Sequence, residues 1–127
     1  MDVRKRVVRK KINKEARKAL KRAAKLIEEG GLHKGYFSVD AEGRFTSPSS
    51  DDSVKWCAVG ALHKACNDMH PDLISNVFGV AMTALQHVVA RDVGKFRSVS
   101  VWNDAPSTTP KDVVRGLKEA RRKLKNA

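Results

Sequence analysis

The feature that most restricts the fold of this chain is a set of apolar residues at helical spacing in its first quarter. They follow one another at intervals of four, three and four residues and share one face of a helix: Ala16, Leu20, Ala23 and Ile27. Lysine and arginine fill the opposite face, and Gly30 and Gly31 adopt a positive φ easily and end helices. The pattern predicts an amphipathic helix over residues 11–29, with one face on a core and the other in solvent.

Residues 1–10 are basic, contain three valines and lack a clear periodicity. We expect them to form either an N-terminal arm or the first turns of the following helix. Residues 11–127 are expected to form a single globular domain, since one domain takes roughly 100–200 residues.

The middle of the chain predicts a hairpin followed by two helices. Residues 36–39 and 44–46 have strand composition, and residues 40–43 between them form a turn that ends in glycine. Residues 53–67 and 71–91 then carry apolar residues at helical spacing. Because residues 71–91 are apolar over much of their circumference, that helix is expected to be central and the most buried.

The last third predicts one more strand and one more helix. Residues 95–102 are assigned to a strand on their β-branched and aromatic content. The final helix has strong start signals: Thr109 as N-cap, Pro110 at the first position and Asp112 at the third. The expected fold is a compact α+β domain with four main helices and a small antiparallel sheet, in the order α-β-β-α-α-β-α.

Charge is concentrated at the two ends of the chain. The net charge is +12, of which residues 1–25 carry +10 and residues 111–127 carry +5, whereas residues 26–110 carry −3. Such segregation indicates an anionic partner such as nucleic acid, a nucleotide or an acidic protein face. The alternative is that these are solvated helix surfaces that keep a small protein in solution.

Ten cations are the candidate nucleic-acid contacts, six from the first helix and four from the last. They are Lys14, Arg17, Lys18, Lys21, Arg22, Lys25, Arg115, Lys118, Arg121 and Arg122. Such a stripe binds phosphates without reading sequence. No aromatic residues are interleaved with it, so base stacking is not indicated, and no helix-turn-helix, zinc-finger or RNA-recognition signature is present.

The expected cellular compartment follows from three sequence features that we do not find: a membrane span, a signal peptide and a disulfide framework. The most apolar stretch, residues 73–90, is too polar for a membrane span, and no apolar run follows the basic N-terminus as in a signal peptide. Two cysteines do not make a disulfide framework. We expect a cytoplasmic protein with reduced thiols and no membrane partner.

Two segments resemble a known family. Residues 56–62 read W-C-A-V-G-A-L and residues 101–106 read V-W-N-D-A-P. This pair is similar to an uncharacterised family, a domain of unknown function, of small bacterial and bacteriophage proteins. The resemblance would cover roughly residues 16–124 and implies a fold and a phage or prophage setting, but no activity. The chain departs from the pattern at residues 31–33, where the family often has Trp, and in its basic extension at residues 1–15.

Cys57 is the candidate catalytic residue. A helix starting near residues 51–53 would place it in the first turns, where the helix dipole favours a thiolate. A cysteine hydrolase would also need a base, for which the chain offers His33, His63, His70 and His87. The alternative is a buried, unreactive thiol, which is the usual fate of a free cysteine in apolar surroundings.

A metal site is not expected. Cys57 and Cys66 lack the short paired spacing of structural zinc sites, although His63 and Cys66 are helical neighbours that could supply half of one. No cofactor is expected either, because the phosphate-binding motif of nucleotide triphosphatases is absent.

Asn103 and Asp104 have two interpretations. In the structural one they hydrogen-bond the local backbone and fix a turn, while Trp102 packs on the small residues of the 53–67 helix. In the functional one Trp56, Cys57, Trp102, Asn103 and Asp104 surround a pocket for a small ligand such as a nucleotide.

The favoured hypothesis is a small basic, non-enzymatic binding protein that docks on nucleic acid or another polyanion through its terminal helices. A phage or bacterial accessory or counter-defence role would suit such a protein. The alternatives are a cysteine-dependent hydrolase using Cys57, or a small-ligand binder near Cys57 and Asp104.

Overall fold

The computed structural model describes residues 2–35, 37–69, 74–91 and 96–125. Over these residues the chain is mainly helical, with a small antiparallel sheet, which confirms the α+β class. The helices are α1 (Val3–Gly30), α2 (Ala58–Met69), α3 (Ile74–Arg91), α4 (Val99–Asp104) and α5 (Pro110–Lys125). The strands are β1 (Ser38–Val39) and β2 (Lys55–Trp56).

Helix α1 begins earlier than its apolar periodicity indicates. The Asp2 side chain accepts hydrogen bonds from the backbone N–H groups of Arg4 and Lys5, so it caps the helix at Val3. At the other end Gly31 has a φ of 106° and donates its N–H to the Ile27 carbonyl. The 28 residues of α1 make a rod of about 42 Å at 1.5 Å per residue.

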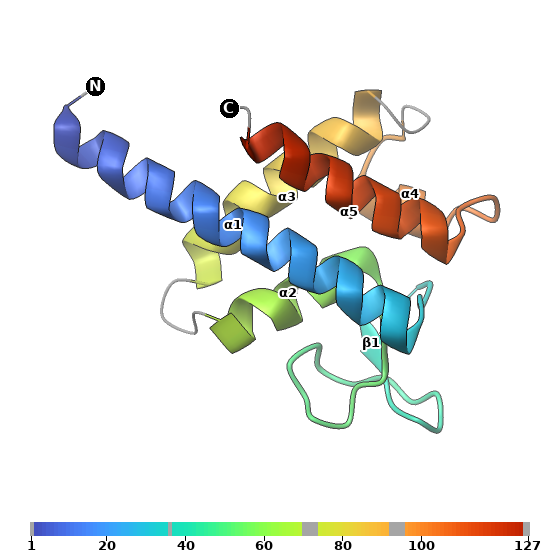
Figure 1. The fold of residues 1–127 in the computed structure, drawn as a ribbon. Helices are drawn as coiled ribbons and strands as arrows, with labels where there is room; N and C mark the ends of the chain where they lie inside the picture. The colour runs from blue at the N-terminus through green and yellow to red at the C-terminus, as the bar shows by residue number, and fades with distance from the viewer. Residues whose placement is uncertain (1, 36, 70–73, 92–95, 126–127) are drawn as a thin grey trace.

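Helices α1 and α5 lie side by side and run in opposite directions, with α3 behind them and α2 below (Figure 1). The buried stripe of α1 begins at Ala16 and is mostly alanine, so neighbouring helices can approach closely. It packs with large residues of the other helices, among them Leu62, Leu85 and Leu117, in one core.

The N-terminal turns of α1 extend beyond the rest of the helices (Figure 1). Residues 3–11 are all exposed, and we call them the overhang. Their side chains contribute little to the core, although their backbone continues the helix.

Helix α3 is less enclosed than predicted. Val77, Ala81, Leu85 and Val88 are buried, but the opposite side of the helix is exposed to solvent. The expectation of a helix buried on most sides is therefore wrong, because no other described element covers that side. The predicted start at residues 71–73 lies outside the described residues.

The predicted hairpin is present as a short antiparallel pairing: Val39 and Phe45 form a bridge, the Asp40 N–H donates to the Arg44 carbonyl, and the Thr46 N–H donates to the Ser38 carbonyl. The ladder partner of β1 is β2, with Ser38 opposite Trp56 and Val39 opposite Lys55. Residues 53–57 were predicted to be helical and are instead extended, because the carbonyls of Phe37 and Val39 accept the N–H groups of Cys57 and Val54. Tyr36, in the first predicted strand, lies outside the described residues.

The strand predicted at residues 95–102 is wrong: residues 99–104 form α4. The Ser98 side chain accepts the N–H of Val101 and caps the helix at 3.1 Å. The Gln86 side chain bonds both the Val99 N–H and the Arg97 carbonyl from α3. The residue types of this segment do not reveal these hydrogen bonds, which is why its composition predicted a strand. Residues 92–95 lie outside the described residues.

The predicted start of α5 is confirmed. The Thr109 N–H donates to the Asp112 carboxylate at 2.9 Å, and the Asp112 N–H donates to Thr109 Oγ1 at 3.2 Å. This reciprocal pair satisfies two backbone donors at the helix start. It also lowers the pKa of Asp112, chiefly through the hydrogen bond from the Thr109 backbone.

Candidate functional sites

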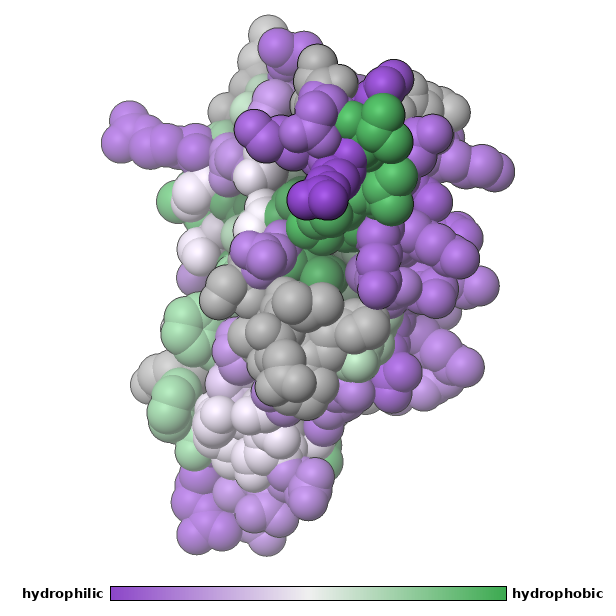
Figure 2. Space-filling model, turned by 90° about the vertical axis from the view of Figure 1, so that its left-hand side faces the viewer, coloured by the Kyte–Doolittle hydropathy of each residue, from purple (hydrophilic) through white to green (hydrophobic). Residues whose placement is uncertain are grey.

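The ten predicted cations of α1 and α5 form the first candidate site, which we call the basic face. On α1 the helical spacing places Lys14, Lys18, Lys21 and Lys25 opposite the buried stripe, and all four are exposed. Helices α1 and α5, which carry the two sets of cations, pack against each other. On α1, however, Lys18, Lys21, Arg22 and Lys25 line a hollow with Met69 of α2, and the groove toward α5 is lined on its α1 side by Ile27 and Glu28. In Figure 2 the side of the molecule that carries α1 and α5 lies at the right and is hydrophilic over most of its height.

Acidic neighbours engage part of the basic face. In the part of the chain that the structure describes, six of the ten cations form ion pairs: Lys18–Glu15, Arg22–Asp68, Lys25–Glu29, Arg115–Asp112, Lys118–Glu28 and Arg122–Glu119. The six cationic side chains are still at least 54% exposed. Exposed pairs of this kind contribute about 0–1 kcal/mol each, so a phosphate can replace the carboxylate at little cost.

Lys14, Arg17, Lys21 and Arg121 form no ion pair with any described residue. Three of the four are exposed and Arg17 is partly buried. These cations are therefore the ones whose charge faces solvent without local compensation.

A groove of about 740 Å³ runs along the contact between α1 and α5. Its floor is apolar, from Ile27, Pro110 and Val114, and its walls carry four cations, Lys111, Arg115, Lys118 and Arg122. Two carboxylates, Glu28 and Glu119, also line it, and Lys118 bridges the helices through Glu28 at 3.0 Å. The four α5 cations that line this groove therefore lie close to the C-terminal part of α1.

The second candidate site is a small cavity of about 200 Å³. It is lined by Gly35, Phe37, Cys57, Val59, Ser100, Asn103 and Asp104. Three of the five predicted pocket residues thus meet although they are about forty-five residues apart in the chain. Gly35, Phe37 and Ser100 were not predicted to be there, and nothing in their local sequence indicates it, because α4 was assigned to a strand.

Neither tryptophan of the two motifs lines the cavity. Trp56 packs against Gly30, and its Nε1–H donates to the Pro48 carbonyl at 3.1 Å. Trp102 is buried against Gly116 of α5, where an added Cβ would lie 2.7 Å from its ring. Both are core residues, and Gly60 packs instead on the Phe37 backbone.

Asn103 is a structural residue. It is 1% exposed, and its Oδ1 accepts the N–H of Ala58, the first residue of α2, at 2.9 Å. Its Nδ2 donates to the His33 carbonyl at 3.1 Å and to Asp104 Oδ1 at 3.0 Å. One amide therefore joins the start of α2, the end of α4 and the loop after α1, and supports the structural interpretation of Asn103.

Cys57 lies immediately before α2, one residue outside the helix. Its carbonyl accepts the Ala61 N–H, and its Sγ accepts the Gly60 N–H at 3.3 Å. Burial raises the pKa of this thiol, and the Asp104 carboxylate raises it further, against the lowering effect of the backbone N–H groups. The thiol is thus held neutral near pH 7, which is opposite to what a cysteine nucleophile needs.

No histidine is among the residues that line the cavity. His63 lies on α2 with its ring 6.0 Å from Phe78, His87 is exposed on α3, and His33 contributes a backbone carbonyl to Asn103. His70 lies outside the described residues. Among the described residues, no hydrogen bond between a histidine ring and the Cys57 thiol accompanies the contacts of this cavity.

Among the described residues, no three histidine, cysteine or acidic side chains are grouped to hold a metal ion. Cys66 is fully buried, and burial raises its pKa to about 11. No described helix has the length and apolar character that crossing a membrane requires.

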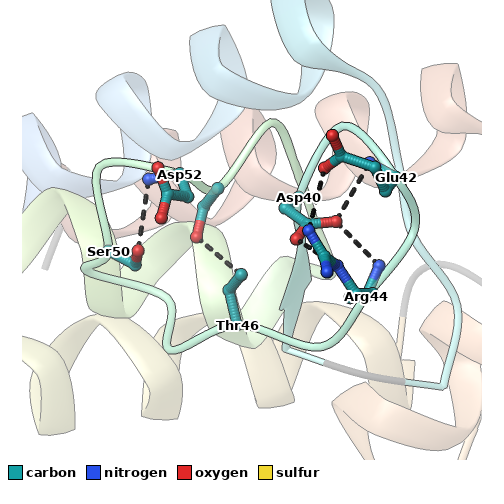
Figure 3. Close-up of polar contacts among 7 residues, drawn as sticks. Asp40, Glu42, Arg44, Thr46, Ser50 and Asp52 are labelled. Carbon is teal, nitrogen blue, oxygen red and sulfur yellow. Dashed lines mark hydrogen bonds and ion pairs between the residues drawn. The ribbon is translucent and has the colours of Figure 1, made fainter.

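The loop between the strands is held by its own polar network (Figure 3). The Asp40 carboxylate accepts the N–H groups of Glu42 and Arg44 and pairs with the Arg44 side chain at 3.2 Å. The hydrogen bond from the Arg44 backbone is the main reason that the pKa of Asp40 is lowered. A hydroxyl pair, Thr46 with Ser53 at 2.8 Å, ties the second half of the loop. These contacts define turns and do not converge on a cavity.

The comparison with protein families agrees with the resemblance seen in the two segments. A family model described as a family of unknown function (DUF6197) matches residues 12–123. The chain belongs to this family. The match includes both candidate motifs and the whole of the basic face, and leaves the overhang outside it. No curated protein and no solved structure matches the chain.

Proposed function

We propose that this protein is a non-enzymatic binding module that docks on nucleic acid or another polyanion through the basic face. The observation that supports the proposal is the antiparallel packing of α1 and α5, which makes the two helices that carry the basic segments direct neighbours. Had the two helices packed at opposite sides of the core, each would be a solvated helix and no more.

The surface suits a repeating anion. Cations three or four residues apart on a helix are about 5–6 Å apart, so a row of them can contact successive phosphates. Lys14, Lys18, Lys21 and Lys25 form such a row, and the α5 cations widen it across the groove. No base-reading element accompanies the row, so the expected binding is strong at low salt and independent of sequence.

The deciding experiment is fluorescence anisotropy with a labelled 20-base-pair duplex and a single strand of the same length, over a range of salt concentrations. We expect binding with a steep loss of affinity as salt rises, because each contact releases counterions. Absence of binding at low salt would contradict the proposal.

A pair of double variants tests the location. Lys14→Gln/Lys21→Gln removes two uncompensated charges from the basic face and should weaken binding about tenfold and flatten the salt slope by about 2. Lys55→Gln/Arg97→Gln removes the same charge from exposed positions elsewhere and should change affinity less than about twofold. Equal losses for both would mean that only total charge matters.

The setting that we propose for such a module is an accessory or counter-defence factor of a phage or bacterium. Its small size and sequence-independent contacts suit a protein that coats or masks nucleic acid. Recovery of nucleic acid with the tagged protein from cells, lost in the Lys14→Gln/Lys21→Gln variant, would support this setting.

A second candidate function is favoured by the small cavity, where Cys57, Asn103 and Asp104 meet. Its volume of about 200 Å³ is below the roughly 300–1,000 Å³ of ordinary ligand clefts, so the ligand would be smaller than a nucleotide. Thermal-shift screening of small metabolites with the native protein and Ser100→Tyr tests it. A ligand that stabilises the native protein and not the variant would support the site, and a flat screen would count against it.

A further inference from the structure

A second groove, separate from the basic face and from the small cavity, lies along the open side of α3. It is flanked on one side by the overhang and the next turn of α1, and on the other by the end of α5. Two hollows of about 360 and 590 Å³ adjoin at Val80, which lines both of them, and we treat them together as one groove. We call it the α3 groove.

The floor of the α3 groove is apolar. Val8 and Ile12 continue the buried stripe of α1 beyond the core, and Val80, Ala84 and Leu124 face them from α3 and α5. Val8 is 56% exposed, and a Cβ added at Gly79 would meet no atom within 4 Å. Figure 2 shows an apolar patch in the upper part of this side of the molecule, with hydrophilic residues around it. The groove is therefore open and not filled by any described side chain.

The rim of the α3 groove is cationic. Arg4, Lys5 and Arg9 line the α1 side, and Lys123 lines the α5 side. No carboxylate is among the lining residues, in contrast with the α1–α5 groove, which contains Glu28 and Glu119. An occupant must therefore combine an apolar stripe with negative charge.

We propose that the α3 groove binds an acidic amphipathic helix of a partner protein. Such a helix would lie between α1 and α5 on α3, would complete a four-helix packing arrangement, and would place its carboxylates against Arg4 and Lys5. A second copy of this chain would bring a cationic rim against a cationic rim in a protein of net charge +12. Nucleic acid offers no apolar stripe for the floor, and a flat membrane does not reach the floor of a groove between helices.

The test uses a labelled 18-residue peptide with leucines at helical spacing and glutamates elsewhere, and a scrambled peptide of the same composition. Anisotropy at about 0.15 M salt should show the amphipathic peptide binding at least about tenfold more tightly than the scrambled one, because only the former presents an apolar stripe. Equal binding of the two peptides, or no binding of either, would overturn the proposal.

Variants at one position separate charge from bulk. Gly79→Glu and Gly79→Gln add side chains of nearly equal size in open space, and both favour the helix over glycine, so folding is preserved. Gly79→Glu should weaken peptide binding at least about tenfold relative to Gly79→Gln, since its carboxylate opposes the peptide's charges. An equal effect of the two variants would overturn the acidic character of the occupant.

Two further arms separate the α3 groove from its rivals. Val80→Ser should weaken peptide binding, whereas Lys14→Gln/Lys21→Gln, which alters only the basic face, should change it less than about twofold. Vesicles containing anionic lipid serve as the alternative ligand. Binding to vesicles that Gly79→Glu abolishes, without binding to the peptide, would replace the proposed partner by a membrane. Because the readout is peptide binding, failure here leaves the nucleic-acid test unaffected.

Discussion

Two regions of this protein differ in how closely their residues are held by hydrogen bonds to the rest of the chain. Where α2, α4 and the loop after α1 meet, which we call the junction, side chains and backbone groups of different segments are joined by hydrogen bonds. Asn103 alone bonds three segments of the chain there. In the overhang, residues 3–11 are all exposed, and the specified contact at its start is the Asp2 cap. The residues that give the sequence its family motif therefore hold the fold, and the residues that give the overhang its charge lie exposed on the surface of α1.

The difference explains why the two kinds of signal must be interpreted differently. Distinctive residue types such as Trp102 and Asn103 attract a functional interpretation, yet their surroundings are buried and hydrogen-bonded within the protein. Repetitive lysine and arginine attract a dismissive interpretation, yet they lie exposed on two helices that pack against each other. If the comparison is right, substitutions at the junction change stability, and substitutions in the overhang change binding.

The largest expected effect is at Gly60. An added Cβ would lie 2.0 Å from the Phe37 carbonyl oxygen, which is backbone and cannot move aside cheaply. Gly60→Ala should lower the free energy of unfolding by about 3 kcal/mol or prevent folding. Urea denaturation measures it, with Gly79→Ala as control. That glycine has open space around it, so the same change should be neutral or stabilising by up to about 1 kcal/mol. Equal free energies of unfolding for Gly60→Ala and Gly79→Ala would contradict the tight packing that we describe around Gly60.

The next effect is at Asn103. Asn103→Ala removes the cap of α2 and leaves the Ala58 N–H and the His33 carbonyl without their partner, which should cost about 2–3 kcal/mol. Asn13→Ala makes the same change next to the overhang and should stay within about 0.5 kcal/mol. Denaturation curves with equal midpoints for Asn103→Ala and the native protein would show that the junction is not held by this amide.

The buried thiols give a pH dependence that sharpens the comparison. Burial raises the pKa of Cys66 from 9.0 to about 11, so the folded state holds its proton more tightly than the unfolded chain. The contribution to stability is complete below pH 9 and is lost as the pH rises from about 9 to 11. It should amount to about 2 kcal/mol at most.

The measurement for Cys66 is the free energy of unfolding at pH 8 and at pH 10.5, in the native protein and in Cys66→Ala. The variant should lose part of the pH dependence, and unchanged slopes would contradict the assignment. Thiol alkylation provides a second readout. Cys57 and Cys66 should react slowly at pH 7.5 in the folded protein and rapidly in denaturant, whereas fast reaction of Cys57 in the folded protein would revive the hydrolase hypothesis.

The smallest effect on stability is expected from removing residues 2–11. These residues bury no side chain, so the unfolding free energy should change by less than about 0.5 kcal/mol. The same deletion removes all six lysines and arginines of the overhang, so affinity for a polyanion should fall markedly at low salt. A large loss of stability would show that the overhang belongs to the core after all.

The parts of the fold that depend on local pattern were predictable. The apolar stripe from Ala16 to Ile27 and the reciprocal cap between Thr109 and Asp112 are written in residues close together in sequence. The α+β class and the family resemblance follow from such patterns. They were confirmed because helices of this length are dominated by their own periodicity.

The parts that failed depend on distant partners. Residues 53–57 have helical composition but are drawn into a strand by the carbonyls of Phe37 and Val39. Residues 99–104 have strand composition but are held as a helix by Gln86 from α3, together with the cap from the neighbouring Ser98, a local signal that the strand assignment overlooked. For the same reason, the two motifs could suggest that Cys57, Asn103 and Asp104 share a pocket but could not establish it. No feature of the sequence indicated that Gly35 and Ser100 line the same pocket. The α3 groove likewise depends on tertiary packing, because none of the described elements covers that side of α3.

The crowding of like charges in the overhang has a consequence for how the molecule responds to its medium. Lys5 and Arg9, Arg6 and Lys10, and Lys10 and Lys14 each stand one helical turn apart, where cations repel and weaken a helix. Added electrolyte relieves that repulsion, while it also competes for the anions that the overhang would contact. Higher ionic strength should therefore increase the helical order of the overhang and, at the same time, lower its affinity for a polyanion. A bound polyanion would also increase the helical order, because it neutralises the repelling cations without competing for the contact.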